Sequence, residues 1–158
     1  MLLVETFVGP SKIEGVGVFA VSKIRAGTLI WKYVPKFDLA ISRKELEEMP
    51  LSIRNLMTRY AYPHHEDHGV LVIESDNGRF MNHADAPNTD FKPQIEAFAL
   101  CDIEPGAELT CDYREFDPNF QLLPSEVAAY LDARKGANGH KPSVRARKRR
   151  EVADARAG

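Results

Sequence analysis

The run RFMNHADAPN, Arg79–Asn88, says more about the architecture of this protein than any other part of the sequence. Its apolar residues follow neither the two-residue period of a strand nor the 3.6-residue period of a helix. Asn82 and His83 are adjacent polar residues after two apolar ones, and Pro87 and Asn88 favour a turn. If the polar pair is buried, both side chains need hydrogen-bond partners. Taken alone, the run is compatible with a structural pair in a loop, so its neighbours must decide.

Strands are predicted on both sides of this run. Stretches rich in β-branched and aromatic residues lie at 2–8, 16–21, 28–34, 70–74, 95–100 and 106–113. Gly-Pro, Gly-x-Gly and Ala-Gly pairs punctuate the first three stretches.

A helical insert is predicted at about residues 42–62. Ser42 and Glu45 form an S-x-x-E capping box, which predicts a helix start. The apolar face of a second helix is predicted from the spacing of Ile53, Leu56, Met57 and Tyr60. Strands, a helical insert and more strands predict an α+β domain that is mainly β, since a doubly wound sheet would need helices throughout.

Composition limits the class of protein. The 158 residues suit one domain, and a hydrophobic fraction of 44% is enough for a core. No apolar run reaches the ~18 residues of a membrane span, and the N-terminus lacks the pattern of a secretory signal, so we expect no membrane contact. Cys101 and Cys111 have no structural-zinc spacing and suit free thiols in a reducing compartment.

Charge divides the chain into an acidic body and a basic end. Residues 134–158 carry nine basic and two acidic side chains, or +7, which leaves 21−9 = 12 basic and 23−2 = 21 acidic side chains, or −9, in the rest. We expect one domain at 1–123, a C-terminal helix at 124–136 and a basic, disordered tail at 137–158. The run Arg145–Arg150 suits either contact with nucleic-acid phosphates or a solvated arm.

Two further segments carry polar groups suited to a site. In Glu14–Ala20, Gly15 and Gly17 allow a sharp turn and the close approach of a ligand. In Glu108–Tyr113, a tyrosine beside an acid ends a strand. Each segment alone also fits a simple structural explanation, a turn in the first case and a buried phenol in the second.

In this order, the segments make the chain resemble the SET-domain protein lysine methyltransferases. That family has a GxG turn, then RFxNHxxxPN, then Gly-(Glu/Ala)-Glu-Leu-Thr-x-Asp-Tyr. The matching residues are Gly15–Gly17, Arg79–Asn88 and Gly106–Tyr113, with Ile24–Ile30 similar to an early family strand. The resemblance covers roughly residues 4–120. It implies small β-sheets around a knot-like crossing, which is rare among folds.

The resemblance also implies a site. It implies S-adenosylmethionine as cofactor, a protein or peptide bearing a lysine as substrate, and Tyr113 as the catalytic tyrosine. The cofactor residues that it implies are Glu14, Gly15, Val16, Gly17, Arg79, Asn82, His83, Tyr60, Tyr62 and Phe116, with Phe120 beside the last. The lysine channel that it implies is lined by Tyr33, Phe91 and Cys111.

Three departures from the family pattern stand out. Ala84 replaces the serine of Asn-His-Ser, the 32–36 stretch keeps only its tyrosine, and zinc-binding cysteine flanks are absent. The family also has Phe or Tyr where this chain has Cys111. A small residue there predicts a roomy channel and more than one methylation, unless Phe91 or Phe98 fills the gap.

Alternatives to an enzyme stay open at this stage. One is a catalytically silent SET-like binding module, and another is a nucleic-acid-associated protein acting through Arg145–Arg150. The sequence also leaves a homodimer open. We expect a cytoplasmic protein if the source is bacterial and a nuclear one if it is eukaryotic or viral.

A histidine-rich run, His64–His68, has the residue types of a metal site. Because adjacent ligands rarely close one tetrahedral site, the sequence favours a solvated loop and predicts no metal.

Overall fold

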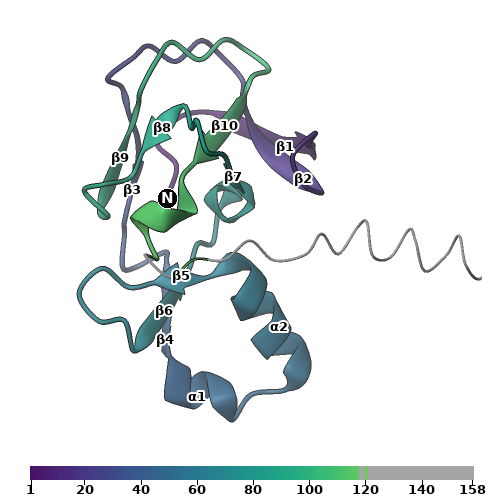
Figure 1. Cartoon of the computed structure of the whole chain (residues 1–158), viewed down its shortest axis with the longest axis vertical. Helices are drawn as coiled ribbons and strands as arrows, with labels where there is room; N and C mark the ends of the chain where they lie inside the picture. The colour runs from purple at the N-terminus through teal and green to yellow at the C-terminus, as the bar shows by residue number, and fades with distance from the viewer. Residues whose placement is uncertain (118–119, 121–158) are drawn as a thin grey trace, which may run out of the picture. The chain divides into compact units, whose positions relative to one another are not determined.

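The computed structural model describes residues 1–117 and 120, which belong to one compact unit, Met1–Leu122 (Figure 1). Its strands are β1 (Thr6–Pro10), β2 (Val16–Ala20), β3 (Leu29–Lys32), β4 (Leu39–Ser42), β5 (Tyr62–Pro63), β6 (Val70–Ile73), β7 (Asn82–His83), β8 (Thr89–Asp90), β9 (Glu96–Ala99) and β10 (Glu108–Cys111). Its helices are α1 (Arg43–Glu47), α2 (Leu51–Tyr60) and the 3₁₀ turns η1 (Asn77–Phe80) and η2 (Tyr113–Glu115). The helix expected at 124–136 and the tail at 137–158 lie outside the described residues.

The strands form three small sheets. Their orders are β1-β2-β10-β7, β3-β9-β8 and β4-β6-β5. An α+β fold that is mainly β is thus confirmed. Within the described residues, no helix is long and apolar enough to cross a membrane.

The first sheet brings the three sequence motifs together. β2 carries the second glycine of the Gly-x-Gly turn and pairs antiparallel with β10. On its other side β10 pairs in parallel with β7, so that Thr110 lies opposite Asn82 and Cys111 opposite His83. Segments about 30 and about 90 residues apart in the sequence are therefore neighbours in one sheet.

Buried side chains fix the register of this sheet. Val18 on β2 lies opposite Leu109 on β10, and both are fully buried. A slip of one residue would turn both toward the other face, and each buried side chain contributes roughly 1.5–3 kcal/mol. The same core holds Trp31 and Ile30 of β3, so the first two sheets share one apolar cluster.

The helical insert packs through a separate, smaller cluster of Leu46, Met57 and Leu71. The predicted capping box is confirmed: the Glu45 N–H donates to Ser42 Oγ (3.1 Å), and the Ser42 N–H donates to Glu45 Oε2 (3.0 Å).

The predicted apolar face of α2 is only partly right. Met57 is buried, but Ile53 and Leu56 are 40% and 48% exposed. The helix contacts α1 and β6, and Met57 is its one buried residue, so these neighbours cover less of the helix than its apolar period predicts.

The first predicted strand was placed too early. β1 begins at Thr6, whereas Leu2 forms only an isolated bridge with Trp31. That bridge is made by the Leu3 N–H, which donates to the Ile30 carbonyl (2.7 Å), and the Lys32 N–H, which donates to the Met1 carbonyl (3.0 Å). The Leu2 N–H donates to the Asp76 carboxylate (2.6 Å).

Candidate functional site

The Asn82 side chain fastens the Gly-x-Gly turn to β7. Its Nδ2 lies 3.2 Å from the Glu14 carbonyl, 3.0 Å from the Val16 carbonyl and 2.8 Å from Glu108 Oε1. Two hydrogens serve three acceptors, so the donor capacity of this amide is used up. A direct bond from Asn82 to a ligand would have to come from its Oδ1 or its main chain.

Glu108 anchors the same assembly from β10. Its carboxylate accepts from the Ser11 hydroxyl at 2.8 and 2.9 Å as well as from Asn82. A Cβ at Gly17 would overlap this carboxylate. The absence of a side chain at Gly17 therefore makes room for Glu108.

Gly15 is needed for its backbone conformation rather than for the space that its missing side chain leaves. Its φ is +46°, and nothing lies within 4 Å of where its Cβ would be. The left-handed backbone at Gly15 turns the chain and leaves its main chain open. The neighbouring Glu14 carboxylate lies 3.4 Å from Arg59 of α2, which ties the turn to the insert.

Tyr113 follows β10 and is held at both ends. Its N–H donates to His83 Nδ1 (3.2 Å), and its hydroxyl donates to the Met81 carbonyl (2.6 Å). Burial, with a smaller contribution from Cys111, raises the pKa of Tyr113 above its usual value. The phenol is therefore neutral at ordinary pH.

An aromatic group surrounds this phenol. The His83 ring lies 5.4 Å from that of Tyr113, and the Phe120 ring lies 5.3 and 5.1 Å from the two. Because His83 Nδ1 accepts from the Tyr113 N–H, a neutral His83 carries its hydrogen on Nε2. That nitrogen lies 3.6 Å from Asp85.

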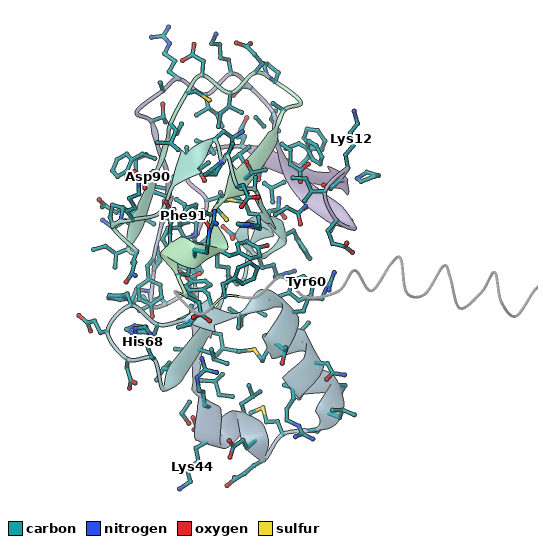
Figure 2. The ribbon with its side chains drawn as sticks, viewed as in Figure 1. Lys12, Lys44, Tyr60, His68, Asp90 and Phe91 are labelled. Carbon is teal, nitrogen blue, oxygen red and sulfur yellow. The ribbon has the colours of Figure 1, made fainter. Side chains whose placement is uncertain are left out.

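Two of the three implied channel residues are buried together in the main core. Phe91 is 2% and Cys111 3% exposed. The Phe91 ring lies 5.1 Å from Trp31 and 4.9 Å from Phe116 (Figure 2). Burial raises the pKa of the Cys111 thiol. The third residue, Tyr33, packs edge-on against His64 and His65 instead.

The implied cofactor aromatics separate into two places. Tyr60, at the end of α2, packs edge-on against Phe80 (5.6 Å) and contributes to the raised pKa of Tyr113 (Figure 2). Tyr62 and Phe116 pack on each other at 5.2 Å, on the same side as Phe91. Their assignment to the cofactor stays a prediction.

Arg79 is engaged by the chain itself. Its Nη1 donates to the carbonyls of Glu74 (3.3 Å) and Ser75 (3.0 Å), and its guanidinium lies 4.7 Å above the Phe80 ring. It thereby braces the turn that leads into β7. Pairing of Arg79 with a cofactor carboxylate stays a prediction.

Sequence reasoning missed Glu115. Its carboxylate accepts from the Phe91 N–H (2.8 Å), and its carbonyl accepts from Gln94 Nε2 (3.2 Å). Gln94 has a φ of +60°, unusual for a residue other than glycine. Glu115 thus connects the turn after Tyr113 to the loop that carries Phe91. No local sequence pattern predicts such a contact.

Buried carboxylates were missed as well. Asp38 and Glu74 are 3% and 7% exposed, and burial raises the pKa of Glu74 to about 8. Among the described residues, the buried side-chain atoms without a hydrogen-bond partner are Trp31 Nε1, Asp38 Oδ1, Tyr62 Oη and Glu74 Oε2. Burial also raises the pKa of Tyr62.

Comparison with known proteins places this geometry among described folds. The SET domain family model matches residues 15–114. A search among curated proteins found no significant match.

Solved structures share the fold. A histone methyltransferase candidate from Plasmodium falciparum is 22% identical, with a TM-score of 0.51, over 71% of this chain and 95% of that chain. A humanized mutant of Polycomb Repressive Complex 2 from Chaetomium thermophilum is 23% identical, with a TM-score of 0.54, over 78% of this chain and 19% of that chain. An active polycomb repressive complex 2 in the basal state is 24% identical, with a TM-score of 0.52, over 70% of this chain and 15% of that chain. This chain thus spans less than a fifth of the polycomb chains that it matches.

Proposed function

This chain belongs to the SET-domain family, and from that premise we propose that it is an S-adenosylmethionine-dependent methyltransferase acting on a lysine of a protein or peptide. The observation that carries the proposal is the convergence at β7. Asn82 fastens the Glu14–Val16 turn on one side, and the Met81 carbonyl anchors the Tyr113 hydroxyl on the other. Three motifs that are distant in the sequence thus meet at two consecutive residues, Met81 and Asn82.

The residues present fit the proposed cofactor. A ligand with polar and aromatic parts needs open main-chain groups and aromatic surface. The left-handed turn at Gly15 offers open main chain, and His83 with Phe120 offers aromatic surface beside Tyr113. We propose that the main chain at 14–16, Asn82 and His83 hold the cofactor, which when bound supplies a methyl group on a positively charged sulfonium.

The chain's own task is to present a neutral amine. Free lysine has a pKa of about 10.4, and burial among apolar groups lowers it. Phe91 and Cys111 supply such surroundings. Because the raised pKa of Cys111 keeps it a thiol, it is a poor competitor for the methyl group.

Tyr113 has a defined part in this scheme. Its hydroxyl hydrogen is given to Met81, so toward a substrate amine the oxygen can only accept. Accepting an N–H from the amine would orient it and leave the nitrogen lone pair free to attack. A neutral phenol suits this role, because it neither donates to the lone pair nor adds charge.

The test combines binding with transfer. Calorimetry with S-adenosylmethionine should give saturable 1:1 binding. Incubation with labelled cofactor and cell lysate, followed by mass spectrometry, should locate methyl groups on lysine Nζ, and Tyr113→Phe should abolish most of the label. Methyl groups on another residue type, or no cofactor binding, would contradict the proposal.

The two other functions predict different results. A silent binding module would bind cofactor or partner without transferring a methyl group. A nucleic-acid-associated protein would shift DNA in a salt-dependent manner that is lost when residues 145–150 are removed.

A further inference from the structure

The loop between β5 and β6 is held in place by its own hydrogen bonds. The His64 N–H donates to the Val70 carbonyl (3.0 Å), and the Val70 N–H donates to the Asp67 carbonyl (2.9 Å). The Gly69 N–H donates to Asp67 Oδ1 (2.8 Å). The side chains at its start are therefore presented by a defined backbone.

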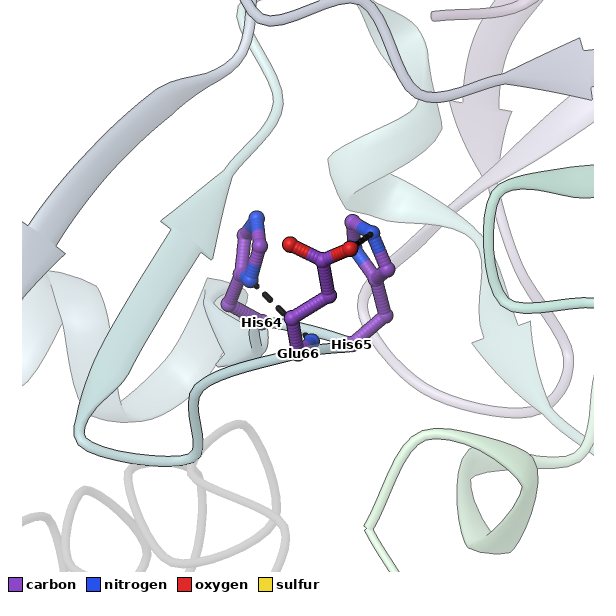
Figure 3. Close-up of side chains that lie close together, drawn as sticks. All are labelled: His64, His65 and Glu66. Atoms are coloured by element: carbon purple, nitrogen blue, oxygen red, sulfur yellow. Dashed lines mark hydrogen bonds and ion pairs between the residues drawn. The ribbon is translucent and has the colours of Figure 1, made fainter.

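Three side chains with metal-binding atoms gather at that start. One ligand atom each of His64, His65 and Glu66 lies within 4.8 Å of the others. The two imidazole rings lie 4.2 Å apart at 34°, and Figure 3 shows the Glu66 side chain turned back toward them. Successive residues of a strand point to opposite faces, but β5 ends at Pro63, so both rings can turn to one side.

Tyr33 restrains the two rings. It packs edge-on against both, with 5.5 Å between ring centres in each case. The His65 side chain is 23% exposed, whereas that of Glu66 is 79% exposed. The imidazole rings of His64 and His65 are thus restrained, whereas the exposed Glu66 carboxylate can adjust its distance to a bound metal ion.

We propose that His64, His65 and Glu66 bind a divalent late transition-metal ion, with Zn²⁺ as the representative. Two imidazoles and one carboxylate suit zinc, cobalt or nickel, whereas calcium and magnesium prefer all-oxygen sites. Three protein ligands leave a fourth tetrahedral position for water. The proposal does not depend on the methyltransferase activity.

A hydrogen bond to His64 should lower the affinity of this site for a metal ion. The Glu66 N–H donates to His64 Nδ1 (3.2 Å), so a neutral His64 carries its hydrogen on Nε2. Neither nitrogen can bind a metal until that bond is broken or the hydrogen moves. We therefore expect roughly micromolar dissociation constants, weaker than those of closed structural zinc sites.

The experiment uses the full chain without an affinity tag, in a Cys101→Ser background, because the exposed Cys101 thiol can itself bind zinc. Titration calorimetry with Zn²⁺ should give one site, and Co²⁺ should give the visible absorption of a tetrahedral complex. His65→Ala and Glu66→Gln should each weaken Zn²⁺ binding by about tenfold or more. Since Glu66 is exposed, its variant tests the site without disturbing packing.

His68→Ala is the matched control, because His68 lies in the same loop, is exposed and is outside the cluster (Figure 2). It should bind Zn²⁺ like the parent. The proposal is overturned if the parent shows no saturable binding, if Glu66→Gln and His65→Ala both bind like the parent, or if His68→Ala loses as much affinity as His65→Ala.

Discussion

The hydroxyl of Tyr113 donates a 2.6 Å hydrogen bond to the carbonyl of Met81, the residue before Asn82. The bond joins the segment after β10 to the segment before β7, two strands that already pair in parallel. Packing against His83 and Phe120 holds the ring in the same place. The position of the phenol oxygen is therefore set by the fold around it, and its removal should affect catalysis more than stability.

Tyr113→Phe should lower the methyl-transfer rate by about 10²-fold or more, since an oriented polar group is lost. The volume hardly changes, and one hydrogen bond to Met81 disappears, so unfolding should become easier by only about 0.5–1.5 kcal/mol. Single-turnover kinetics and urea denaturation measure the two effects. An unchanged rate in a folded variant would rule out a role for this hydroxyl.

Asn82→Ala should weaken cofactor binding and destabilise the fold. The Glu14 and Val16 carbonyls and the Glu108 carboxylate all lose a donor. Because these acceptors are half-buried or exposed, the expected loss is about 0.5–1.5 kcal/mol for each hydrogen bond. Calorimetry with cofactor and urea denaturation report the losses separately. Full cofactor affinity in the variant would show that the turn does not need this fastening.

Gly17→Ala should be much less harmful when Glu108 is also shortened. A Cβ at Gly17 overlaps the Glu108 carboxylate, so Glu108→Ala should relieve part of the damage. Gly15→Ala is the matched control: it should lose roughly 1–2 kcal/mol from its positive φ, with or without Glu108→Ala. Additive effects of Gly17→Ala and Glu108→Ala on unfolding would contradict the contact.

Features of the site that depend on residues close together in the sequence could be predicted, whereas contacts between residues far apart in the sequence could not. The strands containing Val18, Trp31 and Leu109 carry local β-forming patterns and were expected. β5, β7 and β8 have two residues each, so only distant pairing defines them. The contact between Gly17 and Glu108 requires the register of β2 against β10, which no local pattern encodes.

The grouping of His64 and His65 also depends on residues that are far apart in the sequence. The expectation of a solvated loop rested on the rule that adjacent ligands rarely close one tetrahedral site. The convergence of His64 and His65 depends on where β5 ends and on Tyr33, which lies 31 residues earlier in the sequence. The buried Glu74 was likewise hidden, because an acid at the end of an apolar run usually faces solvent.

Stability should decline as pH rises through the range set by Glu74. Burial raises its pKa from 4.5 to about 8, helped by Asp76 and Asp38 and opposed by the Met1 ammonium. Between these values the native state binds more protons than the unfolded one. The stabilising contribution is therefore full below about pH 4.5 and is lost as pH approaches 8.

Glu74→Gln should flatten this dependence and gain stability relative to wild type at pH 8, by an amount on the order of a few kcal/mol. Urea denaturation from pH 5 to 9 measures it. Glu5→Gln, which removes an exposed carboxyl, should leave the pH profile as it is in wild type. A Glu74→Gln profile parallel to that of wild type would mean that Glu74 is ionised throughout.

In the proposed reaction, Cys111 should allow more than one methyl group to be added to the lysine. It lies two residues before Tyr113, is 3% exposed, and is smaller than the aromatic residues of the family. Mass spectrometry of products with excess cofactor should show higher methylation states for wild type and fewer for Cys111→Tyr. Because a larger side chain in a packed core costs about 1–3 kcal/mol, the variant's urea denaturation must show that it is folded.

Phe91 offers the competing explanation, because it is buried in the same cluster as Cys111 and is restrained through the bond from its N–H to Glu115. If Phe91 fills the space beside Cys111, wild type should stop at one methyl group, and Phe91→Leu should extend the product to two or three. If the channel is already roomy, Phe91→Leu should change the rate but not the final state. A wild type that stops at one methyl group therefore contradicts the role given to Cys111, and the Phe91→Leu product identifies whether Phe91 closes the channel instead.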